Sequence, residues 1–168
     1  MKWFLALSLF FYCLAAPAQR MPMEELRSLY KRAAVEKEAC ETALTKLETV
    51  KLETNPLLFG YKGSVTMMMA QHVSNPFNKL SYFHKGKNML DEAIQADNSN
   101  TELRFLRFAA QTNAPAMLGY RGNVEVDKKL ILEALPTIDD ASLKRLIVDY
   151  LVNSEFLNTE EKDKLVKA

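Results

Sequence analysis

Two short segments of the chain share a pattern that could bind a ligand. Residues 56–63, PLLFGYKG, and residues 115–122, PAMLGYRG, both read P-x-x-[FL]-G-Y-[KR]-G. Each places a tyrosine beside a cation, so a ring, a hydroxyl and a positive charge are available together. The match indicates a diverged duplication or a coincidence of eight residues. Its other interpretation is structural, because glycines permit tight turns and close helix packing.

If the elements around these segments form a groove, tyrosines and cations are the expected lining. Arg104 and Arg107 join the set because they lie in the apolar stretch 102–108, where a guanidinium must reach solvent or meet a carboxylate. We predict no catalytic residues. The residues that we expect to bind a partner are Tyr61, Lys62, Arg104, Arg107, Tyr120 and Arg121.

A second cluster has the residue types of a soft-metal site. Met68 lies four residues before His72, so the two share a face of a helix, and Met67 and Met69 flank Met68. A thioether and an imidazole together suit an ion such as Cu(I). Methionines also fill irregular gaps in a core, and we expect no metal and no other cofactor. Copper handling through Met67–Met69 and His72 stays an alternative function.

Enzyme motifs are scarce in the sequence. It contains no Gly-x-Ser-x-Gly elbow and no glycine-rich phosphate loop, and the pairs Asp139-Asp140 and Glu160-Glu161 fall at expected helix starts, where anions stabilise the helix dipole. Cys40 is expected to be a small buried residue. We therefore lean toward a function without catalysis, although a hydrolase whose triad is assembled from distant residues stays an alternative.

Helices must position all of these side chains. Asn55-Pro56 and Asn75-Pro76 each predict an N-cap followed by a proline at the first helical position. No alternation typical of strands occurs, so we expect an all-α fold of about seven helices, and the short connections favour antiparallel hairpins. Five of the expected helices span residues 22–52, 76–97, 124–135, 140–153 and 159–167, and two others begin at residues 56 and 101.

The stretch 87–100, KNMLDEAIQADNSN, resembles the second helix and terminal turn of a tetratricopeptide repeat. Ala93 matches the small residue that packs between the helices, and Asn98 stands where the family has proline. The resemblance implies helical hairpins stacked as a short array. The segments 55–58, 79–83 and 103–107 are similar to uncharacterised secreted proteins of Bacteroidota bacteria, a likeness that implies no known activity.

The first residues of the 168-residue chain have the features of a secretory signal peptide. Lys2 precedes an apolar run from Trp3 to Ala16, and Ala16-Pro17-Ala18 offers a cleavage site. The run is shorter than the about 20 residues of a spanning helix. We expect a signal peptide at 1–18, a single helical domain at 19–168, and a periplasmic or secreted protein with no stable membrane anchor.

The balance of positive and negative charges excludes nucleic acid as a partner. After cleavage, 21 basic and 21 acidic side chains remain, because Lys2 is the one charged residue before position 19. A neutral chain lacks the phosphate attraction on which nucleic-acid binders rely. Stacked hairpins form concave surfaces, so we expect a binding or scaffold module for a protein or peptide partner.

Overall fold

The computed structural model describes residues 22–167, so the predicted signal peptide lies outside the described residues. Within this range the chain forms eight α-helices, two 3₁₀ turns and no strand, which confirms the all-α prediction. No helix there is long and apolar enough to cross a membrane. The elements are α1 (Met23–Ala33), α2 (Lys37–Lys46), α3 (Pro56–His72), α4 (Pro76–Ala96), α5 (Thr101–Asn113), η1 (Ala116–Leu118), α6 (Val124–Ala134), η2 (Leu135–Thr137), α7 (Ala141–Val152) and α8 (Thr159–Lys167).

Side-chain caps define where several helices begin. The Asn55 side chain accepts a hydrogen bond from the Leu58 backbone N–H at 2.9 Å, and Asn75 and Asn100 cap α4 and α5 in the same way. Each satisfies an N–H that has no partner within its helix. The caps and the prolines of the two Asn-Pro pairs therefore confirm the predicted starts of α3 and α4.

The helix expected over residues 22–52 is in fact two helices, so the count is eight and not seven. The chain leaves α1 at Ala33, and the backbone N–H groups of Val35 and Glu36 both donate to the Arg32 carbonyl in the turn before α2. A straight helix over this range would be about 45 Å long. Breaking it lets α2 fold back against α1, and both helices bury their apolar faces.

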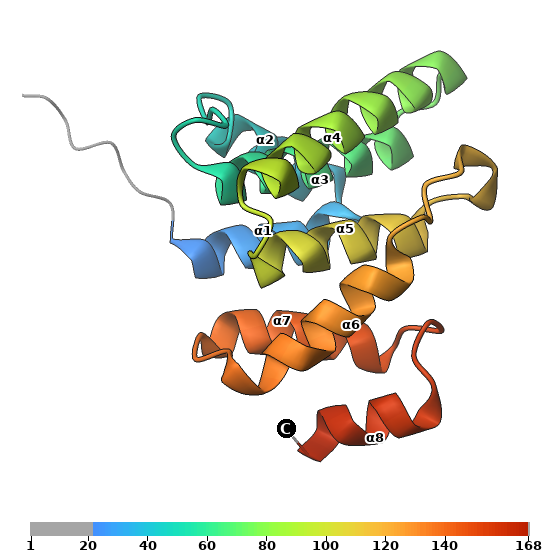
Figure 1. Ribbon diagram of the computed structural model, residues 1–168. Helices are drawn as coiled ribbons and strands as arrows, with labels where there is room; N and C mark the ends of the chain where they lie inside the picture. The colour runs from blue at the N-terminus through green and yellow to red at the C-terminus, as the bar shows by residue number, and fades with distance from the viewer. Residues whose placement is uncertain (1–21, 168) are drawn as a thin grey trace, which may run out of the picture.

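The helices lie in three tiers (Figure 1). α2, α3 and α4 form the upper tier, α1 and α5 cross the middle, and α6, α7 and α8 form the lower one. α5 contacts α3 and α4 above and α6 and α7 below. Its side chains Phe105, Leu106 and Phe108 are fully buried, so α5 forms the centre of the core.

α3 and α4 form an antiparallel hairpin, held together by an unusually close crossing. Gly63 and Gly86 face each other, and Met67 of α3 also contacts Gly86. A Cβ atom added to Gly86 would lie 2.6 Å from the backbone N of Met67, closer than real Cβ atoms approach. Only residues without a side chain allow the two backbones to meet here.

Gly86→Ala is therefore expected to lower the free energy of unfolding by about 1–3 kcal/mol, because overpacking outweighs the better helix propensity of alanine. Gly122→Ala is the matched control, since a Cβ there meets no atom within 4 Å. Urea denaturation followed by circular dichroism measures both. Equal stability of the two variants would contradict the close crossing.

Candidate functional site

Tyr61, the first of the six residues expected to bind a partner, lies in the core. Its side chain is fully buried, its hydroxyl donates to Glu102 Oε1, and its ring makes an edge contact with Tyr30 at a centroid distance of 5.5 Å. Burial, and then the nearby Glu102 carboxylate, raise the pKa of Tyr61 well above its usual value. The prediction that Tyr61 lines a groove is wrong, because its hydroxyl is needed to satisfy a buried carboxylate.

Glu102 belongs to a buried ion cluster that joins four helices. The Arg27 guanidinium donates to both oxygens of Glu102, at 2.8 and 2.9 Å, and to Asp140 Oδ2 at 2.7 Å. Arg27 and Glu102 are both about 5% exposed. Because Arg27 is on α1, Tyr61 on α3, Glu102 on α5 and Asp140 caps α7, the cluster fixes these helices relative to one another.

Arg104 and Arg107 both lie close to the Asp127 carboxylate, as expected for arginines in an apolar stretch. Arg107 is buried and binds Asp127 through two hydrogen bonds of 2.6 and 2.8 Å. Arg104 donates twice to the Asn98 carbonyl and lies 3.4 Å from the Asp127 carboxylate. The two arginines therefore connect α5 to α6, and Arg107 is not available to a partner.

Tyr120 is also buried. Its hydroxyl lies 3.3 Å from Asp91 Oδ1, and the Lys87 ammonium lies 5.4 Å from its ring centroid. Burial, followed by the Asp91 carboxylate, raises the pKa of this phenol. Tyr120 holds the loop after α5 against α4, so the prediction that it lines a groove is wrong.

Lys62 and Arg121 each contact a different segment of the chain. Lys62 Nζ donates to the backbone carbonyls of Glu48 and Val50, at 2.6 and 3.2 Å, and so fixes the segment after α2. Arg121 is exposed, and its guanidinium lies 5.6 Å from the ring centroid of Phe156. The six residues are thus spread over the molecule and do not line one surface.

The two copies of the repeated eight-residue pattern have different conformations. Residues 56–63 begin α3, whereas residues 115–122 form the turn η1 and a loop in which Gly119 has a φ of 61°. This left-handed conformation favours glycine. The pattern is therefore not a repeated structural unit, although each copy places a buried tyrosine next to a carboxylate.

His72, the candidate metal ligand, and Cys40, the candidate thiol, both contact other parts of the fold. His72 Nε2 lies 2.7 Å from the Ala33 carbonyl, so this nitrogen donates the hydrogen bond and only Nδ1 keeps a lone pair. Among residues 22–167, no group of three or more His, Cys, Asp or Glu side chains is placed to hold a metal ion. Cys40 is fully buried as expected, and burial raises the pKa of its thiol to about 11.

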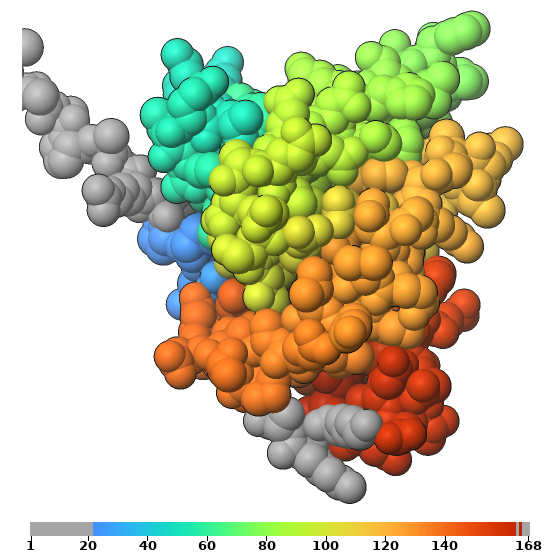
Figure 2. Space-filling view, viewed as in Figure 1, coloured from blue at the N-terminus to red at the C-terminus, as the bar shows by residue number. Residues whose placement is uncertain are grey.

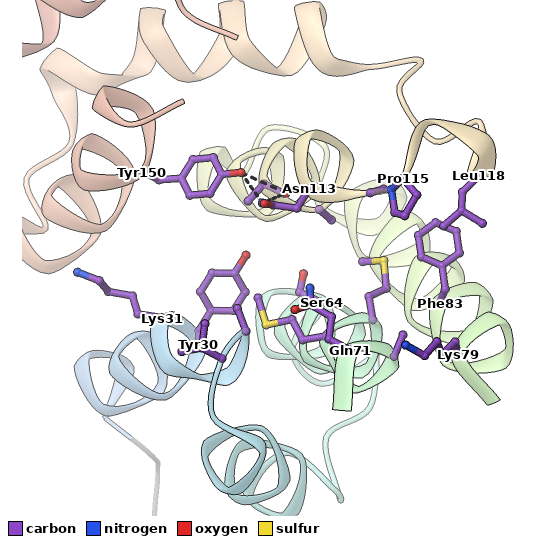
Figure 3. A pocket seen from close by; sticks show the side chains of 18 of the residues that line it. Tyr30, Lys31, Ser64, Gln71, Lys79, Phe83, Asn113, Pro115, Leu118 and Tyr150 are labelled. Atoms are coloured by element: carbon purple, nitrogen blue, oxygen red, sulfur yellow. Dashed lines mark hydrogen bonds between the residues drawn. The ribbon is translucent and has the colours of Figure 1, made fainter. Parts of the chain in front are cut away.

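A groove of about 900 Å³ lies elsewhere, between α1, α3, α4, α5 and α7 (Figure 3). None of the six predicted residues lines it. Its walls are mostly apolar, and Met68, the methionine of the proposed metal pair, is one of them. Its lining includes Tyr30, Ser64, Met67, Phe83, Phe105 and Tyr150. A volume and lining of this kind are typical of a binding site.

Large apolar side chains stand exposed along the rim of the groove. Val35 is 81% exposed, Leu80 44% and Met117 91%, and all three line the groove. Phe77, 83% exposed, is next to the lining residue Pro76. The end of the α3–α4 hairpin and the loop after α5 project from the same edge of the molecule, where their side chains leave a notch (Figure 2). Clustered exposed apolar residues are characteristic of an interaction site.

Polar groups enter the groove at few places. The Tyr150 hydroxyl on α7 interacts with Thr112 Oγ1 and Asn113 Nδ2, both at 2.6 Å. The Tyr30 hydroxyl and Ser64 Oγ have no hydrogen-bond partner among residues 22–167. Figure 3 shows the Tyr30 hydroxyl directed into the space between the two walls.

Comparison with protein-family models, with curated proteins and with solved structures found no significant match to this chain. The resemblance to tetratricopeptide repeats and to secreted Bacteroidota proteins stays a prediction.

Tyr61→Phe is expected to lower the free energy of unfolding by about 1.5–3 kcal/mol, because it removes a buried donor to a charged acceptor. Tyr120→Phe is expected to cost less than about 1 kcal/mol, since its hydroxyl lies 3.3 Å from Asp91. Chemical denaturation of both variants checks the difference. A larger loss for Tyr120→Phe would contradict these roles.

Asp140 gives the cluster a dependence on pH. Its pKa is lowered from 3.8, first by the hydrogen bond from the Leu143 N–H and then by Arg27. The stability from this shift is present above the unfolded-state pKa and is lost as pH falls through the folded-state pKa. Asp140→Asn should therefore lose less stability than the wild type between about pH 5 and pH 2.

The control for this pH series is Asp139→Asn, which changes an exposed neighbouring carboxylate that makes no ion pair within the described chain. It should keep the wild-type dependence when thermal unfolding is followed at each pH. Identical slopes for Asp140→Asn and the wild type would show that Asp140 does not stabilise the fold through its charge.

Proposed function

We propose that the protein is a binding module, without a catalytic role, that holds a segment of a protein or peptide partner in the groove. One observation carries the proposal: an apolar groove of about 900 Å³ has exposed apolar side chains along its rim. Covering Leu80 and Met117 would remove their apolar surface from water, and this favours association. The expected signal peptide places this binding in the periplasm or outside the cell.

The residues of the rim favour a partner with varied apolar side chains. Met67, Met68 and Met117 all line the groove, and methionine side chains are unbranched and adapt their shape to what they contact. The lining comes from five helices and η1, so a ligand in the groove would contact most of the fold at once. Binding is therefore expected to raise the thermal stability of the whole protein.

A phage-displayed library of random peptides, selected on the purified protein, tests the proposal. We expect enriched peptides with several apolar residues, and Leu80→Asp should weaken their binding about tenfold by placing a charge against an apolar ligand. Leu130→Asp is the matched control, because Leu130 is 40% exposed, close to the 44% of Leu80, and lies on α6 outside the groove.

Selection of no peptide, or equal loss of binding in the Leu80 and Leu130 variants, would overturn the proposed function. The second outcome would place the binding surface elsewhere on the molecule.

A further inference from the structure

Two hydroxyl groups in the groove lack partners. Ser64 is 2% exposed, lines the groove, and its Oγ makes no hydrogen bond within the described chain. The Tyr30 hydroxyl lies on the adjacent wall and is likewise unpartnered there. A buried polar group without a partner is costly, and this applies to Ser64 Oγ. Both hydroxyls can donate to an acceptor that enters the groove. The groove therefore favours an occupant that carries polar groups between its apolar ones.

The need for hydrogen-bond acceptors distinguishes three classes of occupant: an acyl chain, an α-helix and an extended peptide. A plain acyl chain has no polar group to offer along its length. An α-helix satisfies its backbone groups internally, apart from its ends. An extended peptide has free C=O and N–H groups between side chains that alternate in direction, so it can satisfy Ser64 and Tyr30 while its apolar side chains fill the groove.

The two ends of the groove also differ in net charge. Lys31 Nζ and Asp149 Oδ2 lie 2.8 Å apart, so they neutralise each other at one end. Lys79 lies at the other end in Figure 3, and no carboxylate of residues 22–167 pairs with it. It is in the first turns of α4, where the helix dipole adds positive charge and the first turn has no acidic residue.

We infer that the occupant is an extended apolar peptide segment with an acidic side chain that lies against Lys79. This inference rests on the proposed function and specifies the chemistry of the partner at the same site. The apolar side chains fill the groove, the peptide carbonyls accept hydrogen bonds from Tyr30 and Ser64, and the carboxylate neutralises the unpaired ammonium.

Charge reversal at Lys79 tests the acidic partner group. The probes are the peptides enriched by selection on the wild-type protein, with their affinities measured by fluorescence anisotropy. We expect Asp or Glu beside the apolar residues, an affinity about fivefold lower for Lys79→Glu, and weaker wild-type binding at high salt. Lys85→Glu makes the same change of charge at an exposed position of α4 outside the groove, and it should bind normally.

Removal of a hydroxyl tests the extended backbone. Ser64→Ala should reduce peptide affinity about fivefold without lowering the melting temperature, because Ser64 has no partner to lose in the free protein. Thr66→Ala is the control on the same helix. Its hydroxyl donates to the Lys62 carbonyl at 2.7 Å and does not line the groove, so this variant should leave affinity unchanged.

Three outcomes would overturn the inference. Enriched peptides without acidic residues, or with unchanged affinity for Lys79→Glu and Ser64→Ala, would refute the assigned chemistry and leave the proposed function standing. Peptides that bind as helices, seen by circular dichroism of the complex, would do the same. Absence of any peptide, together with displacement of a fluorescent fatty acid by dodecanoate, would refute both proposals and assign the groove to an acyl chain.

Discussion

The Arg27 cluster is the interaction on which the groove depends. A guanidinium buried with the Glu102 carboxylate is stable only while both are fully hydrogen-bonded, and the partners that complete this requirement, Tyr61 and Asp140, come from two further elements. Helices α1, α3, α5 and α7 are thereby held in a fixed arrangement. The same four helices, with α4, form the walls of the groove.

The position of α4, the fifth wall of the groove, is set by its glycine crossing with α3. Because Gly63 and Gly86 let the backbones meet, α4 lies close against α3, and its first turns extend past α5 with Leu80 and Lys79 on the rim. Among the described residues, Ser64 Oγ has no hydrogen-bond partner and no carboxylate pairs with Lys79, and on the proposed account these two groups make the groove selective.

Local signals in the sequence were sufficient for the fold class and several helix starts, since an Asn-Pro pair acts within one turn. The break at residues 34–36 cannot be predicted from residue spacing, because Ala33 and Cys40 keep helical spacing across it. The residue types of Tyr61 and Tyr120 suggest a binding role, but nothing near them in the sequence shows that their hydroxyls interact with Glu102 and Asp91. The groove has no local signature, because its small and apolar lining comes from six separate elements.

The methionine methyl groups offer the most direct test of the groove as a binding surface. In protein labelled with ¹³C at these methyl groups, titration with the most enriched peptide should shift the NMR signals of Met68 and Met117, which line the groove. The signals of Met23 and Met89, which do not line it, should stay in place. Binding that shifts Met23 and Met89 and leaves Met68 and Met117 unchanged would contradict the account.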